Sequence, residues 1–264
     1  MTYAHRVVWI TGASSGIGKA LAIAFARERA RVVLTARSRA SLTRVRDECR
    51  AYTDWCEIAP IDLEKIDEIP HLVERELELS GGIDLVVHCA GVSQRSTALE
   101  TDLAVDRRIM DVNFFGTVAL TKAVLPSMIA SGRGQIAVVS SIVGLFGFPL
   151  RSAYAASKHA LQGFFETLSM ELREYGVGVT IVSPGRIKTD ISKHALGGNG
   201  EPYGRRSPGQ ELGLSAERCA KKIVKGVKRN KRAVYVGGRE LIMVWLRKWI
   251  PPLFFYVARR VKPE

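Results

Sequence analysis

Short apolar runs rich in valine and isoleucine recur along the chain, and amphipathic stretches separate them. Within each run the hydrophobicity is continuous rather than alternating, which is typical of strands that are buried on both faces of a sheet. We therefore expect about seven strands, at 7–11, 31–35, 56–61, 83–88, 135–140, 179–183 and 233–237.

The stretches between these runs place apolar residues three and four positions apart, which predicts helices. Regular alternation of strand and helix predicts one doubly wound, Rossmann-like α/β domain with helices on both faces of a parallel sheet. Because the crossovers are right-handed, the ligand is expected beyond the carboxyl ends of the strands. The expected helices are 17–29, 38–50, 66–80, 103–130, 153–175 and 215–230.

Two segments depart from this alternation. Residues 190–214 are rich in glycine and proline, and so long a connection inside a compact fold is usually functional, so we expect a lid over the substrate. Residues 239–264 form a basic, aromatic extension to a catalytic domain at 1–238. At the other end, only four apolar residues precede the first glycine turn, so neither a signal peptide nor a spanning segment is expected there.

The composition is that of a globular protein, with 47% hydrophobic and 25% charged residues among 264. The net charge of +13 is concentrated at one end, because 14 of the 39 Lys and Arg residues lie at 218–264 with two of the 26 acidic residues. Such an end favours an anionic partner, membrane or nucleic acid, or is a solvated helix face. The four cysteines lack metal-ligand spacing, so we expect no metal site, and buried reduced thiols in a cytoplasmic protein are favoured.

The segment TGASSGIG at 11–18 joins the first expected strand to the first helix. Because Gly12, Gly16 and Gly18 have no side chains, the backbone can approach a pyrophosphate held at the helix N-terminus. The spacing differs from GxGxxG, and it is the placement between strand and helix that favours a dinucleotide site.

The end of the second strand indicates which dinucleotide is bound. Folds that bind NAD place a carboxylate there for the ribose hydroxyls, whereas this chain has Ala36 and Arg37. A guanidinium matches a 2′-phosphate that a carboxylate would repel, so NADP(H) is favoured over NAD(H). The alternative is that Arg37 is only an exposed residue at a helix start.

Tyr154 and Lys158 lie four residues apart on an expected helix and therefore on one face of it. A free phenol titrates near ~10, but a neighbouring ammonium favours the phenolate and lowers the pKa, which suits tyrosine to acid–base catalysis. Such a pair is also common by chance.

Six segments together resemble the short-chain dehydrogenase/reductase family over about residues 5–237. They are TGASSGIG, CAG at 89–91, MDVNFFG at 110–116, VVSSIVG at 138–144, YAASK at 154–158 and VSPGRIKTD at 182–190. The segments RSAYAASKHA and ALTKAVLPSM and the basic tail are most similar to the branch with the vertebrate dehydrogenase/reductase member 7 proteins. The resemblance implies an oxidoreductase that interconverts a secondary alcohol and a carbonyl compound, and a homo-oligomer paired through the two longest expected helices.

The resemblance also implies a tetrad of Asn113, Ser141, Tyr154 and Lys158. Tyr154 would protonate the carbonyl oxygen while the nicotinamide delivers hydride, and Ser141 would hydrogen-bond the same oxygen. Lys158 would hold the nicotinamide ribose and lower the pKa of the tyrosine, and Asn113 would anchor a water that relays protons to the lysine. Taken singly, Asn113 is equally an ordinary buried amide and Ser141 a turn residue.

Further positions follow from the resemblance. Asp62, otherwise a helix cap, matches the family position at the adenine amino group, and Thr189 matches the one at the carboxamide. The cofactor-binding residues so implied are Gly12, Ser14, Ser15, Gly16, Ile17, Gly18, Arg37, Asp62, Leu63, Ala90, Gly91, Tyr154, Lys158, Pro184, Gly185 and Thr189.

One position departs from the family pattern. His88 and Cys89 stand where the family has two asparagines, followed by the usual Ala90 and Gly91. The small backbone beside the adenosine is kept, so cofactor binding is expected to survive. Whether His88 replaces the polar contacts of the asparagine is open at this point.

Leu145, Phe146 and Phe148 follow Ser141 and predict an apolar wall beside the nicotinamide, hence a lipophilic ketone or alcohol as substrate. The alternative is that they close the core or a subunit contact. A cofactor-binding regulator without turnover is a second hypothesis, disfavoured because no tetrad position is lost. Nucleic-acid binding is a third, and we do not expect it because the basic end carries no recognition motif.

The tail at 245–262 mixes aromatic residues, a Pro-Pro pair and basic residues. Arg247 and Lys248 divide its apolar residues, so a membrane span is not expected. Aromatic side chains flanked by cations match segments that lie at a lipid surface. We expect a peripheral membrane anchor or an element that flanks the pocket, with a packed tail or a subunit contact as the alternatives.

Overall fold

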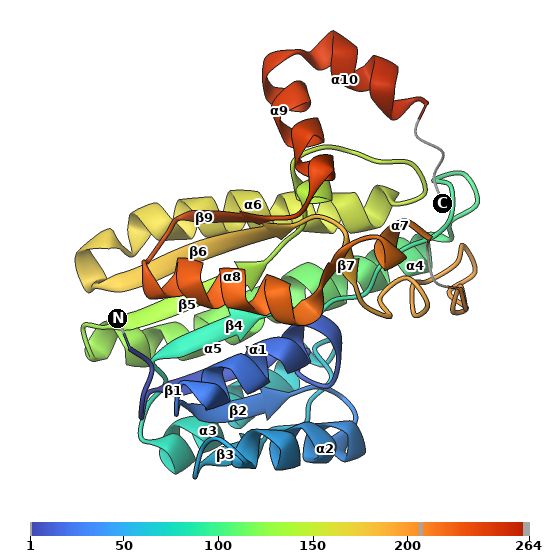
Figure 1. The fold of residues 1–264 in the computed structure, drawn as a ribbon. Helices are drawn as coiled ribbons and strands as arrows, with labels where there is room; N and C mark the ends of the chain where they lie inside the picture. The colour runs from blue at the N-terminus through green and yellow to red at the C-terminus, as the bar shows by residue number, and fades with distance from the viewer. Residues whose placement is uncertain (1, 206–207, 261–264) are drawn as a thin grey trace.

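The computed structural model describes residues 2–205 and 208–260. Seven strands form one parallel sheet in the order β3-β2-β1-β4-β5-β6-β9, which confirms the predicted fold class (Figure 1). The strand order runs outward in both directions from β1 and β4, so a crevice is expected at the carboxyl ends of this central pair. The strands are β1 (Val7–Thr11), β2 (Arg31–Thr35), β3 (Cys56–Ile58), β4 (Leu85–His88), β5 (Gly134–Val139), β6 (Val177–Pro184) and β9 (Ala233–Val236).

Helices cover both faces of the sheet, and each face has its own apolar core (Figure 1). The core under α1, α2 and α8 contains Ile10 and Leu34, and the core under α3, α5 and α6 contains Trp9 and Val33. Successive strand residues point to opposite faces, which is why the runs are apolar at every position. The helices are α1 (Gly16–Arg27), α2 (Arg39–Arg50), α3 (Ile69–Ser80), α4 (Leu103–Met110), α5 (Gly116–Ala130), α6 (Ser152–Glu171) and α8 (Ala216–Lys228).

Most element boundaries differ from the sequence-based expectation by one to three residues, and three differences have a clear structural basis. The third strand ends at Ile58 rather than at 61, shortly before Pro60, which has no amide hydrogen to donate. The helix expected at 103–130 is continuous but passes through a π-helical segment, Asp111–Phe115. The helix expected at 153–175 changes to a 3-10 turn at Arg173–Tyr175.

The stretch 103–130 is also, among the described residues, the one helix long and apolar enough to cross a membrane by length and composition alone. Leu120, Val124 and Met128 of this stretch are buried against the sheet. Core helices pass the same test, so its apolar composition is explained by the core that it covers.

The segment 190–214 is fixed at both ends. β7 (Ile187–Lys188) pairs in parallel with β8 (Leu214–Ser215), which closes the base of the segment. Within it, the backbone amide of Leu196 donates to the carbonyl of Ser93 at 2.8 Å, and its carbonyl accepts from the amide of Arg95 at 2.8 Å. The segment 190–214, called the strap below, therefore lies along the loop that follows β4. A short helix, α7 (Pro208–Glu211), completes it, and 206–207 lie outside the described residues. Its role as a lid remains a prediction.

The C-terminal extension folds as two short helices, α9 (Ile242–Trp249) and α10 (Pro251–Ala258). The two prolines occupy the first turn of α10, where no amide hydrogen is needed, so they start a helix as well as interrupting one. Phe254 is buried against Phe146, with ring centroids 5.2 Å apart. Figure 1 shows the pair standing out from the body above the loop that joins β5 to α6. Residues 261–264 of the predicted extension lie outside the described residues.

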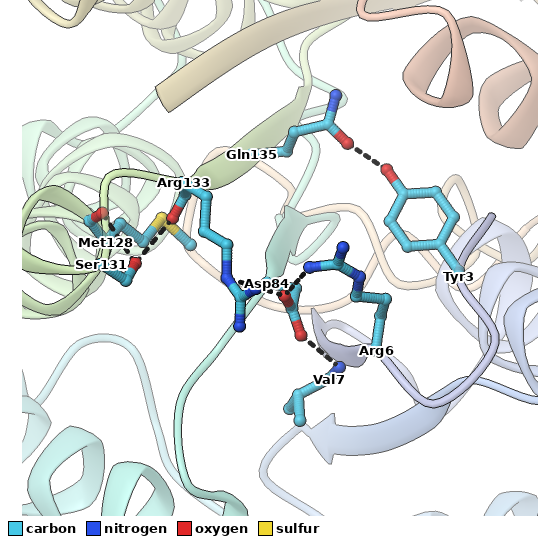
Figure 2. Close-up of polar contacts among 8 residues, drawn as sticks. All are labelled: Tyr3, Arg6, Val7, Asp84, Met128, Ser131, Arg133 and Gln135. Carbon is cyan, nitrogen blue, oxygen red and sulfur yellow. Dashed lines mark hydrogen bonds and ion pairs between the residues drawn. The ribbon is translucent and has the colours of Figure 1, made fainter. Parts of the chain in front are cut away.

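A polar network joins the segments before β1, β4 and β5 (Figure 2). The carboxylate of Asp84 accepts from the backbone N–H of Val7 at 2.9 Å and from Arg6 at 2.6 Å. Tyr3 donates to the side chain of Gln135, whose amide nitrogen donates to the carbonyl of Val227 in α8 at 3.0 Å. The network holds the amino-terminal ends of the central strands and leaves their carboxyl ends for the site.

Candidate active site

The turn between β1 and α1 is built around direct backbone contact. Gly12 has a φ of +65°, and a Cβ there would lie 2.8 Å from the backbone of Ala90. A Cβ at Gly18 would overlap the carbonyl oxygen of Gly12. Gly16 also has positive φ, +53°, and its ideal Cβ would lie 3.1 Å from a methyl of Thr189. Side chains are therefore excluded where the turn meets β4 and where α1 begins.

The N-terminus of α1 keeps its amide groups free of side-chain caps. Its N-cap residue, Ser15, makes no capping hydrogen bond. At α2 and α8, by contrast, Ser38 and Ser215 each accept a hydrogen bond from the first turn at 3.3 Å. The first amides of a helix need an acceptor, and the positive end of the helix dipole favours an anion. A phosphate fits this position.

The chain after β4 forms the wall of the groove opposite the glycine turn. The hydroxyl of Thr11 accepts from the amides of both Cys89 and Ala90 at 3.1 Å. Gly91 follows, and a Cβ there would lie 3.0 Å from the side-chain oxygen of Asn113 and 3.4 Å from Nζ of Lys158. Small residues are therefore required on this wall as well as in the turn.

His88 does not line the groove and instead contacts α5. Its Nε2 lies 2.8 Å from the hydroxyl of Thr121 in α5, and its ring packs 5.9 Å from that of Phe165. Burial lowers the pKa of His88 to about 3, so the ring is neutral. Cys89 is the member of the pair that lines the groove, and burial raises the pKa of its thiol to about 12.

Tyr154 and Lys158 lie one turn apart in α6, and both are buried. Nζ of Lys158 is 5.7 Å from the centroid of the tyrosine ring and donates to the carbonyl of Val139 at 3.0 Å. Ser141, at the end of β5, donates to the carbonyl of Pro184 at 3.4 Å. The helix face and the strand end thus bring these three side chains to one end of the groove.

Burial controls the ionisation of this pair, contrary to the expectation that Lys158 would lower the pKa of the tyrosine. The pKa of Tyr154 is raised by burial, against opposing effects of Arg151 and of a hydrogen bond with Ser141. Burial lowers the pKa of Lys158 to about 8. Both shifts favour the neutral forms, and Lys158 is not among the groups that shift Tyr154.

Asn113 lies in the π-helical segment between α4 and α5. Its amide nitrogen donates to the carbonyl of Val92 and the hydroxyl of Ser157, both at 2.9 Å, and its oxygen accepts from the amide of Val92 at 2.8 Å. The side chain therefore ties the loop after β4 to α6. Its backbone carbonyl accepts from Thr117 at 2.9 Å. Single-turn π-segments occur frequently at functional sites. The water-anchoring role of Asn113 remains a prediction.

One groove of about 530 Å³ is lined by every residue expected to bind cofactor. It also includes Ser141, and Asn113 lies behind its wall through the contacts with Val92 and Gly91. At the far end Arg37 is exposed and forms no ion pair with any residue that the structure describes, and Asp62 accepts from the amide of Glu64 at 3.2 Å. The roles of these residues remain predictions.

The apolar wall expected from 145–148 does not line this groove. Phe146 is buried under Phe254, and Leu145 and Phe148 pack against the same cluster with the extension. The cluster also contains Tyr154, so these residues pack beside the tyrosine and close the core there, as in the alternative interpretation. Apolar residues that do line the groove include Val92, Val139 and Ile191, the last from the segment 190–214.

Arg151 and His194 are among the groove residues that the sequence reasoning missed. Arg151 lies three positions before Tyr154, so helical spacing alone could have pointed to it. His194 comes from the strap, whose path depends on the pairing with 93–95, and no local signal indicates it.

Comparison with known proteins agrees with this geometry. A family model described as short chain dehydrogenase matches residues 6–198. The dehydrogenase/reductase SDR family protein 7-like of Anopheles gambiae is 41% identical over 261 residues, 97% of this chain and 82% of that protein. The dehydrogenase/reductase SDR family member 7B of Xenopus tropicalis is 39% identical over 266 residues, 98% of this chain and 86% of that protein.

Solved structures share the fold. A short chain dehydrogenase/reductase from Burkholderia phymatum in complex with NAD superimposes with a TM-score of 0.84 at 23% identity, over 96% of each chain. An alcohol dehydrogenase from the archaeon Thermococcus sibiricus complexed with 5-hydroxy-NADP has a TM-score of 0.76 at 25% identity, over 89% of this chain and 97% of that one.

Proposed function

The chain belongs to the short-chain dehydrogenase/reductase family and is an oxidoreductase, and from this we propose that it interconverts a secondary alcohol and a carbonyl compound with NADP(H). The observation that carries the proposal is the groove that runs from Arg37, past the glycine-containing turn at Gly12, to Tyr154 and Ser141. An elongated dinucleotide needs such a path, with the phosphates at the turn and the reacting ring at the buried end.

The residues present fit a nicotinamide dinucleotide. Uncapped amides at the start of α1 suit its phosphates, and Gly12, Gly16 and Gly18 leave room for them. Arg37 and Asp62 would hold the adenosine end, and Thr189 and Lys158 the nicotinamide end. When bound, the cofactor supplies or accepts the hydride at the substrate carbon.

Tyr154 acts in this proposal as the acid for reduction. Its raised pKa keeps the phenol protonated at neutral pH, which is the form that can donate a proton to a carbonyl oxygen. The hydroxyl of Ser141 would donate a hydrogen bond to the same oxygen as negative charge develops on it. Lys158, with a pKa of about 8, can return a proton toward the phenol near neutral pH. In the oxidative direction the same groups accept the protons.

Tyr154→Phe is expected to lower kcat for reduction at least ~100-fold, because the phenol supplies the proton. NADPH should still bind, as measured by fluorescence titration. Turnover is followed by NADPH absorbance across a panel of lipophilic ketones and aldehydes, with Tyr175→Phe, an exposed tyrosine, as the matched control. Undiminished turnover in Tyr154→Phe would exclude it as the acid. An unmodified chain that binds NADPH but turns over no substrate would favour the regulator instead.

Arg37 supports a preference for NADP(H), since its guanidinium is exposed at the adenosine end and forms no ion pair with the described residues. Arg37→Asp is expected to weaken NADPH binding by about 10–100-fold more than NADH binding, because a charge-assisted contact of ~1.5–3 kcal/mol is lost. Arg39→Asp makes the same charge change outside the groove and is the control. Equal losses for the two cofactors would refute the phosphate contact.

We also propose that the substrate is lipophilic, because Val92, Val139 and Ile191 line the groove.

The C-terminal extension is proposed to rest on a membrane surface. Trp245, Trp249, Phe255 and Tyr256 are about half exposed or more on α9 and α10. Cations flank them: the guanidinium of Arg260 lies 3.5 Å from the ring centroid of Tyr256, and Nζ of Lys248 lies 5.2 Å from that of Trp249. Exposed aromatics beside cations favour the interface of an anionic bilayer.

Trp245→Ser/Trp249→Ser should lower flotation with vesicles containing phosphatidylserine, because both exposed rings are removed while the buried anchor Phe254 is kept. A chain that ends at Gly238 would uncover Phe146, so the double substitution is the cleaner variant. Tyr52→Ser, at a similarly exposed site outside the extension, is the control. Flotation equal to that of the unmodified chain would remove the membrane role.

A further inference from the structure

Arg151 is a charged side chain at the reacting end of the groove for which the proposed mechanism has no use. It is the N-cap residue of α6, three positions before Tyr154, and it lines the groove together with Tyr154 and Ser141. Its Nε is buried and has no hydrogen-bond partner, and its guanidinium forms no ion pair with any part of the chain that the structure describes. The residue as a whole is half-buried, and a cation that has given up part of its hydration is normally paired.

The described residues around Arg151 supply no counter-charge. Burial lowers its pKa, Tyr154 opposes this shift, and a second cation, Arg186, adds to it. No carboxylate is among these influences. The carboxylate of Glu240, which lies beside Arg186, accepts from the backbone amides of Arg186 and Gly238. Arginine remains protonated despite such shifts, so this corner of the groove is positive.

The start of α6 does not use the guanidinium either. The amide of Ala153 donates to the side-chain oxygen of Gln94 at 2.8 Å, and the amide of Tyr154 donates to the same oxygen at 3.4 Å. Gln94 therefore caps the helix, and Arg151 is not needed for that purpose. The fork of N–H groups on a guanidinium matches the oxygens of a carboxylate or phosphate.

We propose that Arg151 binds an acidic group of the substrate, a carboxylate or a phosphate, close to the reacting carbonyl. The inference rests on the proposed function and refines its substrate class from a neutral lipophilic compound to an amphipathic anion. The apolar part of such a molecule would lie against Val92 and Ile191, while the acid faces Arg151. The charge of Arg186, which acts on Arg151 from outside the groove, would add to the attraction. The cofactor phosphates belong at the glycine turn, at the start of α1 rather than of α6.

Binding to the NADPH-loaded protein tests the proposal without requiring turnover. Octanoate, octyl phosphate and 1-octanol share one chain length and differ in charge, and calorimetry measures each. We expect an acid to bind at least tenfold more tightly than the alcohol, and Arg151→Met to reduce that preference at least tenfold. Arg151→Lys should keep part of it. Arg173→Met, an exposed arginine at the other end of α6, is the control and should keep all of it. Comparing octanoate with octyl phosphate identifies the acid.

A second test measures kcat/KM for oxooctanoates, which carry the ketone at successive positions along the chain. Their methyl esters serve as the neutral counterparts. Arg151→Met is expected to lower the ratio of kcat/KM for acid over ester at least tenfold. An equal loss of kcat/KM on acid and ester would mean that Arg151 acts through Tyr154 rather than on the acid, and would overturn the proposal. Weakened NADPH binding with an unchanged acid preference would overturn it as well. If the unmodified chain turns over neither substrate, the proposed function fails while the calorimetry still decides on the anion site. Acids that bind the unmodified chain no better than octanol would overturn it outright.

Discussion

The site depends on one constraint, which is the contact between the backbone at Gly12, after β1, and the backbone at Ala90, after β4. β1 and β4 are neighbours at the centre of the sheet, and their carboxyl ends approach until an added Cβ would lie 2.8 Å from backbone atoms. The φ of +65° at Gly12 turns the chain back into α1. The positive end of that helix therefore faces the crevice, and the reacting side chains are gathered on its far side.

Burial then sets the chemistry at the reacting end. Tyr154 is buried in the cluster that contains Phe146, and Lys158 is buried beside Gly91. Burial raises the pKa of the tyrosine and lowers that of the lysine. At neutral pH the phenol holds its proton, while the ammonium is close to losing one. Because the folded protein holds Lys158 at a pKa of about 8, against 10.5 for an ordinary lysine, that group costs stability below pH 8. The cost is relieved as pH rises from 8 to 10.5, where the unfolded chain binds more protons. Arg151 adds a cation that has no ion-pair partner among the described residues.

The sequence predicted the sheet and the groove well because both depend on local signals. Continuous apolar runs indicate strands buried on two faces, and the glycines of 11–18 indicate a turn between strand and helix. It could not show that Phe146 is covered by Phe254, because that contact joins segments distant in the chain. Likewise the direction of His88, toward Thr121, depends on how α5 packs on the sheet. The raised pKa of Tyr154 was missed because desolvation is a property of the folded environment, whereas the lysine four residues away is visible in the sequence.

The NADPH dissociation constant of Gly12→Ala tests the central claim most directly. The added methyl meets the backbone of Ala90 and must adopt a conformation that costs ~1–3 kcal/mol, so the turn is expected to shift away from the phosphates. The account predicts binding at least ~10-fold weaker than in the unmodified protein. Gly163→Ala, on an exposed and open position of α6, should bind as the unmodified protein does. An unchanged dissociation constant in folded Gly12→Ala would contradict the claim that backbone contact at this turn forms the cofactor site.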